Sequence, residues 1–328
     1  MTMNGNIPVS MQQVWGWRVI WHLFLVSIAG GGYIGAFIHS LVYPQHSRLF
    51  MALALLAVVP LLIIGIVLLI SHLGTKTKVI RAFCHPSSSW LSRGGITLLV
   101  FLVLDIVHGS LPMTAPPPTP WLPLVHLVMG IVTSLSALFV LLYSGMVLAR
   151  LRSFPCWRSE LLLLLFIVSG LSGGLMMLVL FLLLLGITPN LDVRQPLMLA
   201  MQHTGYVLVV QAIALGCYLW WAMALPAARE YARIITGGAY SITFWVGVVV
   251  VGILVPLGFG LYAAYAQIEG LLLIIFALEL AVFGLVGVLL LRYMIVSAGV
   301  SSTLPVEGNP VTLPPNARAP TSHLVRYH

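Results

Sequence analysis

The chain has 328 residues, of which 60% are hydrophobic and 7% are charged. A soluble domain carries about 25% charged residues, so this chain has too little charge to cover the surface of a water-soluble globule. Intrinsic disorder is excluded as well, because it needs low hydrophobicity and high net charge. The composition therefore predicts an all-α polytopic membrane protein, since helices satisfy their own backbone hydrogen bonds in lipid.

Charge and cysteine content narrow the function further. The 15 Lys and Arg outnumber the 7 Asp and Glu, giving a formal net charge of +8. These cations lie between apolar runs, so we expect no nucleic-acid partner. Cys84, Cys156 and Cys217 form none of the motifs that hold iron–sulfur clusters or c-type haem. We expect no haem, cluster or other metal in this chain, and residues 1–13 lack the regions of a cleaved signal peptide.

Apolar runs long enough to cross a bilayer occur eight times. A spanning helix needs about 20 mostly apolar residues. Tryptophans lie at several of the ends, as interface anchors do. The sequence predicts spans at residues 17–41, 48–73, 94–113, 123–150, 160–186, 198–225, 241–266 and 269–297.

The distribution of cations predicts an orientation. Eight spans place both termini on one face, and only Arg48 and Arg194 fall on the other. Because Lys and Arg favour the cytoplasmic side, we expect cytoplasmic termini in a bacterial cytoplasmic membrane. The alternative is that the basic loops dock a soluble partner. The cations assigned to the face of the termini are Arg18, Lys76, Lys78, Arg81, Arg93, Arg150, Arg152, Arg158, Arg229, Arg233, Arg292, Arg318 and Arg326.

A short motif repeats between the first and fifth spans. FLVSIAGGGYIG starts at Phe24, and FIVSGLSGGLMM starts at Phe166, a constant offset of 142 residues. Five positions match, including a pair of glycines that would let two helix backbones approach closely. The offset of four spans predicts two parallel four-helix repeats. The expected units are a bundle at 1–150, a second bundle at 151–297 and a mobile tail at 298–328.

Three further stretches carry recognisable motifs: WHLFLVSIAGGG at residues 21–32, SHLGTKTKVIRAFCHPSSSWLSRGG at 71–95 and YSGMVLARLRSFPCWRSELLLLLFIVSGLSGG at 143–174. In this order they resemble the NrfD/PsrC family, the membrane subunits of polysulfide reductases and related respiratory enzymes. A weaker match covers 238–257. The resemblance implies an eight-helix anchor that exchanges electrons between menaquinone or ubiquinone and a ferredoxin-like four-cubane iron–sulfur subunit. That subunit would feed a molybdopterin catalytic subunit or another redox module.

The resemblance also implies where a quinone would bind. Polar residues inside a bilayer are costly and are functional candidates by default. His22 and Tyr143 match the family's quinone-contacting histidine and tyrosine, and each type can hydrogen-bond a quinone oxygen. His72, at the end of span two, is a further candidate. Some members carry an asparagine one turn before the histidine, where this chain has Val19.

Deeper polar residues are candidates for a proton path. Asp105 in span three and Glu279 in span eight lie within apolar runs, as does Gln211 in span six. Asp105 and His108 are three residues apart and share one helix face, as a relay would require. The alternative is a structural hydrogen bond between helices.

Two rival functions remain open. His39, His108, His126 and His203 all fall near the face opposite the termini, and a b-type haem anchor needs two histidines at one depth on facing helices. They form one loose layer, which interfacial histidines would also produce. A secondary transporter would need broken helices in both halves, and we expect a break only at Pro256. A structural anchor with a degenerate quinone site is a further alternative.

Overall fold

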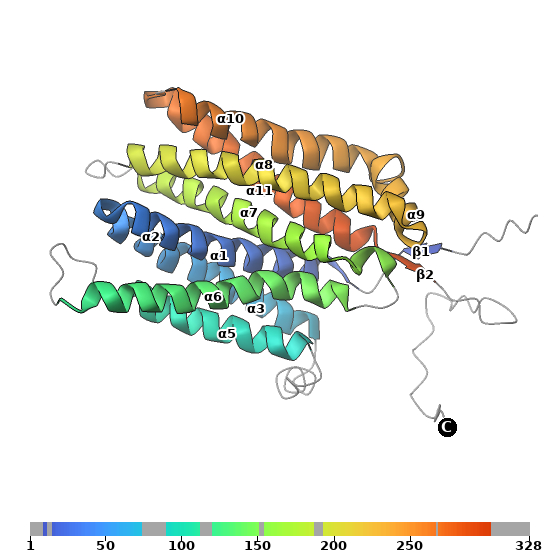
Figure 1. Ribbon diagram of the computed structural model, residues 1–328, viewed down its shortest axis with the longest axis horizontal. Helices are drawn as coiled ribbons and strands as arrows, with labels where there is room; N and C mark the ends of the chain where they lie inside the picture. The colour runs from blue at the N-terminus through green and yellow to red at the C-terminus, as the bar shows by residue number, and fades with distance from the viewer. Residues whose placement is uncertain are drawn as a thin grey trace, which may run out of the picture.

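The computed structural model describes residues 9–11, 15–73, 90–111, 120–150, 154–186, 193–266 and 268–302. Within these residues, eight helical segments are long and apolar enough to cross a membrane, and they run side by side in one bundle (Figure 1). All eight predicted spans and the all-α membrane class are confirmed. The spans are Trp17–Val42, Pro44–His72, Trp90–Gly109, Leu122–Ala149, Glu160–Leu185, Arg194–Ala224, Thr243–Ala263 and Gly270–Ser297.

The elements follow the order of the spans. The first half contains α1 (Trp17–Val42), η1 (Pro44–His46), α2 (Ser47–Leu53), η2 (Ala54–Val58), α3 (Val59–Leu73), α5 (Trp90–Gly109) and α6 (Leu122–Ala149). The second half contains η3 (Pro155–Trp157), α7 (Glu160–Leu185), α8 (Arg194–Ala224), α9 (Pro226–Thr236), η4 (Thr243–Leu254), α10 (Val255–Tyr265) and α11 (Gly270–Ser297). Two short strands, β1 (Val9–Met11) and β2 (Val300–Ser302), flank the helices.

The β1–β2 pair brings the two ends of the described chain together. Val9 pairs with Ser302 and Met11 with Val300 in antiparallel register. The segments that flank the eight spans therefore lie at one end of the bundle, which we call the β end (Figure 1). Of the predicted tail at 298–328, the first residues form this strand, and 303–328 lie outside the described residues.

Span six begins earlier than predicted. The helix starts at Arg194 rather than at residue 198. Arg194 forms an ion pair with Glu269 at 2.5 Å, and both side chains are largely exposed. A paired cation can sit at the polar edge of the bilayer, so the helix continues past its apolar core. Hydropathy alone does not detect such an extension.

Two π-helical segments precede prolines. The segment η2 ends before Val59–Pro60, and η4 ends before Val255–Pro256. A proline removes one backbone donor and its ring clashes with the carbonyl four residues earlier, and a wider turn relieves that clash. The expectation that Pro256 breaks span seven is wrong, because Thr243–Ala263 is a continuous span.

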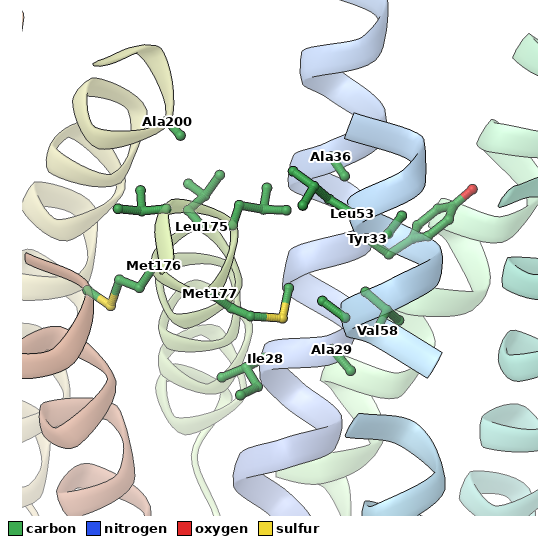
Figure 2. Close-up of a cluster of buried hydrophobic side chains, with 14 of the residues drawn as sticks. Ile28, Ala29, Tyr33, Ala36, Leu53, Val58, Leu175, Met176, Met177 and Ala200 are labelled. Atoms are coloured by element: carbon green, nitrogen blue, oxygen red, sulfur yellow. The ribbon is translucent and has the colours of Figure 1, made fainter. Parts of the chain in front are cut away.

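The two copies of the repeated motif meet at the centre of the bundle. A Cβ added at Gly31 of α1 would overlap the backbone of Gly170, and one added at Gly174 of α7 would overlap the backbone of Gly31 and Gly32. Only glycine permits this approach of two helix backbones. Figure 2 shows α1 and α7 packing side by side, with Ile28 of α1 and Met177 of α7 in the same buried cluster.

The two halves repeat their packing. Helix α1 packs on α3 and α6 of the first half, and α7 packs on α8 and α11 of the second. Helices α1 and α7 then join the halves through their glycine-rich faces. The division into units at 1–150 and 151–297 stays an interpretation. The repeated packing agrees with the predicted pair of four-helix repeats.

Candidate functional site

His22 lies in the second turn of α1, near the β end. Its side chain is buried, and Nδ1 lies 2.8 Å from the carbonyl oxygen of Gly65 on α3. A carbonyl oxygen only accepts, so Nδ1 carries the hydrogen, and Nε2 of the neutral ring is an acceptor. Among the described residues Nε2 has no hydrogen-bond partner, although it is buried. The ring therefore offers one buried lone pair at a fixed orientation.

Tyr143 faces His22 from α6. The ring centroids are 6.3 Å apart and the planes meet edge to face at 72°. Tyr143 is buried, and its ring lies against Gly94 of α5, where any Cβ would overlap it. The structure thus brings the two predicted quinone residues together between α1, α3, α5 and α6, at the same depth below the β end.

His72 stands apart from this pair. It lies in the last turn of α3, and its side chain is exposed. The neighbouring Ser71 carbonyl accepts a hydrogen bond of 3.2 Å from Arg18 of α1, which ties the two helix ends together. His72 is therefore exposed at the end of α3, close enough to act electrostatically on His22 but not buried with the pair.

A second polar cluster lies toward the opposite end of the bundle. The Tyr33 hydroxyl of α1 is 2.5 Å from Nδ1 of His108 on α5. Nε2 of His108 is 2.6 Å from Nδ1 of His126 on α6. If Tyr33 donates to His108 and His108 donates to His126, the outer nitrogen of His126 carries the last hydrogen, and that nitrogen has no partner among the described residues. The three side chains form a continuous hydrogen-bonded chain across three helices.

Asp105 lies one turn from His108 on α5. It is completely buried, and neither carboxyl oxygen has a hydrogen-bond partner among the described residues. A polar group buried in this way costs free energy unless a water, ion or ligand binds it. Asp105 is 11 residues from Gly94, which corresponds to about 16 Å along the helix. The cluster and the His22–Tyr143 pair are therefore separate in depth.

Glu279 does not join this cluster. It is half-buried on α11, which packs mainly against η4, α7, α10 and α1. Asp105 is on α5, which packs mainly against α6, α3 and η2. The structure therefore keeps the two predicted mid-membrane acids in different halves of the bundle.

The predicted histidine layer is resolved into two pairs. His108 pairs with His126 as described, and Nδ1 of His203 on α8 lies 2.9 Å from Nε2 of His39 on α1. His39 also bonds the carbonyl of Gly35 through Nδ1, at 2.7 Å. In the described part of the chain, no group of three or more His, Cys, Asp or Glu side chains is arranged to hold a metal ion.

Two residues escaped the sequence-based predictions. Arg292 was assigned to the basic face of the termini, but it is fully buried on α11, where its guanidinium lies over the ring of Phe166 on α7, 3.7 Å from the centroid. One amino group of Arg292 donates to the Phe166 carbonyl at 3.1 Å, and its Nε and Nη1 have no partner among the described residues. Tyr33 was not a candidate, because aromatic residues are common in apolar helices. For Arg292, the one sequence signal of burial was its position five residues before the end of span eight.

Comparison with known proteins places the chain in a family. Residues 5–303 match the model of the family described as "Polysulphide reductase, NrfD". The protein NrfD of Escherichia coli strain K12 is 26% identical over 313 residues, which cover 87% of this chain and 95% of the relative. The NrfD homolog of Haemophilus influenzae is 24% identical over 333 residues, 91% of this chain and 98% of the relative. The chain therefore belongs to the NrfD family of multi-pass membrane proteins.

Proposed function

We propose that this chain is the quinone-reactive membrane subunit of a respiratory oxidoreductase, which exchanges electrons and protons between quinol and an iron–sulfur partner subunit. The family supports a role as a membrane subunit that works with other redox subunits. The observation that carries the proposal is the unpartnered, buried Nε2 of His22 beside the buried Tyr143. Bound quinol would supply two electrons and two protons at this place.

His22 is suited to take a proton rather than to give one. Its Nδ1 hydrogen is committed to the Gly65 carbonyl, so the free Nε2 of the neutral ring accepts from a hydroxyl. A quinol presents such hydroxyls, whereas a quinone presents only acceptors. Tyr143 supplies a hydroxyl that can donate or accept. The pair would therefore orient a quinol head group and receive its first proton at His22.

The partner subunit belongs at the β end in this proposal. His22 is five residues from the start of α1, about 8 Å along the helix. An iron–sulfur subunit of the ferredoxin-like four-cubane type, docked at that end, would lie close to the head group. It would pass electrons to a molybdopterin subunit or another redox module. With the termini in the bacterial cytoplasm, as the charge bias predicts, this face would be the cytoplasmic one.

We further propose that Asp105 and His108 handle protons on the opposite side of the bilayer. Tyr33, His108 and His126 form a hydrogen-bonded chain that starts near the middle of α1 and ends at half-buried His126, one turn inside α6. Asp105 lies one turn from His108, with no described hydrogen bond to it. Such a chain can pass a proton by shifting each hydrogen to its neighbour. About 16 Å of helix separates it from Tyr143, so it would serve one half of the membrane. Glu279, far from the chain, has the weaker claim.

The test is binding of a quinol analogue to the purified full-length chain, with an absorbance spectrum taken on the same sample. His22→Ala and Tyr143→Phe should each weaken binding about 10-fold or more, because each removes a buried hydrogen-bonding group. His46→Ala and Tyr265→Phe, which alter the same residue types away from the pair, should leave binding unchanged.

Each contrary result favours a named alternative. A Soret band in the spectrum would support the b-type haem anchor. His39 and His203 would then be the candidate haem ligands. Quinol-analogue affinity that is unchanged in both His22→Ala and Tyr143→Phe would contradict the proposed quinone site. An absence of saturable binding to the wild-type chain would favour the alternative of a structural anchor with a degenerate quinone site.

A further inference from the structure

Two histidines from different halves of the bundle contact each other toward the end opposite the β end. Nδ1 of His203 on α8 lies 2.9 Å from Nε2 of His39 on α1. The ring centroids are 4.8 Å apart and the ring planes meet at 66°. His39 is buried three residues before α1 ends, whereas His203 is half-buried. The pair therefore joins a packed helix to a position that ions can reach from water.

The hydrogen positions of this pair follow from Gly35. Nδ1 of His39 lies 2.7 Å from the Gly35 carbonyl oxygen, which only accepts, so this nitrogen carries the hydrogen. Nε2 of His39 is then a lone pair, and His203 donates to it from Nδ1. A histidine that ligates a metal makes the same kind of bond, with its other ring N–H donated to a carbonyl or carboxylate. His39 thus has the tautomer and the fixed orientation of a metal ligand.

The spacing of the two nitrogens is close to that of a metal site. Two nitrogens bound to one tetrahedral Zn²⁺ at about 2.0–2.1 Å are roughly 3.3 Å apart, so the pair would open by about 0.4 Å to admit an ion. His203 would move its hydrogen from Nδ1 to Nε2, so both rings stay neutral and no proton is released. Water would fill the remaining positions around the ion, because His203 is only half-buried.

The second histidine pair of the bundle is less suited to an ion. Nδ1 of His108 is bonded to the Tyr33 hydroxyl, which can donate or accept, so its tautomer is not fixed by a carbonyl. The outer nitrogen of His126 is buried. An ion with two protein ligands needs water as well, and burial keeps water from this place. The pair of His39 and His203 is therefore the better candidate.

We propose that His39 and His203 bind a divalent transition-metal ion of the class that imidazole favours, such as Zn²⁺, Ni²⁺ or Cu²⁺. The ion would connect α1 of the first half to α8 of the second half. Such binding would correct the expectation, drawn from the cysteines, that this chain holds no metal. The site is independent of quinone chemistry, since neither histidine belongs to the His22–Tyr143 pair.

The test is isothermal titration of Zn²⁺ into the full-length chain, purified without a polyhistidine tag. Wild type should bind Zn²⁺ saturably, and Mg²⁺, which prefers oxygen ligands, should not bind. His203→Asn keeps an amide donor toward His39 but removes the metal ligand. Its affinity for Zn²⁺ should fall at least about 30-fold, since loss of an outer-shell partner alone costs about 10–100-fold. His46→Ala removes a histidine at the same end, outside the pair, and should bind as wild type does.

Thermal midpoints give a second readout. Zn²⁺ should raise the midpoint of wild type, because the ion binds the folded chain and connects two helices. It should not raise the midpoint of His203→Asn, whose value without Zn²⁺ reports whether the variant has folded. If His203→Asn does not fold, His39→Gln alters the other ligand and should lose Zn²⁺ affinity to the same extent. Equal Zn²⁺ affinities of wild type and the folded variant would overturn the proposal, as would an equal loss in His46→Ala or equal binding of Mg²⁺.

Discussion

The ring of Tyr143 lies directly against the backbone of Gly94, so that any side chain at position 94 would overlap it. This contact fixes the depth and direction of Tyr143 relative to His22, whose ring it meets edge to face. Four helices therefore meet at the proposed site: α1 and α6 carry His22 and Tyr143, α3 holds His22 through the Gly65 carbonyl, and α5 contributes a position without a side chain. Gly94, near the end of the matching stretch at 71–95, thus has a specific physical role.

The first prediction concerns Gly94→Ala. The added methyl group forces Tyr143 to move, and overpacking of this kind costs about 1–3 kcal/mol. We expect a lower thermal midpoint and quinol-analogue binding weakened about 10-fold, because the tyrosine hydroxyl is displaced. Gly216→Ala on α8 is the matched control, since a Cβ there meets nothing within 4 Å. Wild-type affinity and midpoint in Gly94→Ala would show that Tyr143 is not held by this contact.

The second prediction concerns the crossing of α1 and α7. Gly31→Ala puts a methyl group into the backbone of Gly170, which has no side chain that could rotate away. The helices must separate, and we expect a loss above about 3 kcal/mol, with little monodisperse protein recovered. Gly258→Ala on α10 meets open space and should purify normally. Full recovery of Gly31→Ala would mean that the two halves tolerate a wider separation.

Sequence patterns predicted the parts of the molecule that depend on one helix at a time. Span positions follow from hydropathy, and the nearness of His22 to Tyr143 follows from their similar depth below one face. The chain from Tyr33 to His126 could not be predicted in the same way, because Tyr33 and His108 are 75 residues apart and their meeting depends on how α1 rotates against α5. Arg292 escaped for a related reason, since its burial depends on how α11 packs against α1 and α7, where it contacts Ser27 and Phe166.

The third prediction concerns pH and rests on Tyr231 in α9, outside the membrane spans. Burial raises the pKa of Tyr231 above the ordinary value of 10.0. Above pH 10 the unfolded chain loses this proton while the folded chain keeps it. The free energy of unfolding therefore falls by up to about 1.4 kcal/mol per pH unit from this group, and the stability is fully present only below pH 10.

Tyr231→Phe should remove that dependence. We expect the thermal midpoint of the variant to fall less steeply than that of wild type between pH 10 and pH 11, with little difference in shape between pH 7 and pH 9. Tyr265→Phe, which alters a tyrosine that is 86% exposed at the end of α10, controls for the loss of one hydroxyl. Parallel curves for Tyr231→Phe and wild type would show that Tyr231 ionises as readily in the folded chain as in the unfolded one.

The fourth prediction separates the two polar clusters. His108→Phe removes the middle member of the chain and leaves the Tyr33 hydroxyl and His126 without their partner. Proton transfer through a positioned group is worth about 10²–10⁴-fold in rate. In the intact complex in sealed vesicles, we therefore expect His108→Phe and Asp105→Asn to lower proton movement at the side opposite the β end at least 10-fold.

Quinol-analogue affinity should stay at the wild-type level in both variants, because about 16 Å of helix separates Asp105 from the contact with Tyr143. His46→Ala, at the same end but outside the hydrogen-bonded chain, is the control. A fall in affinity together with proton movement would show that the clusters act as one site. A lower thermal midpoint with unchanged proton movement would show that the Tyr33–His108–His126 chain only stabilises the packing of α1, α5 and α6. Asp105 would then have no role in proton movement.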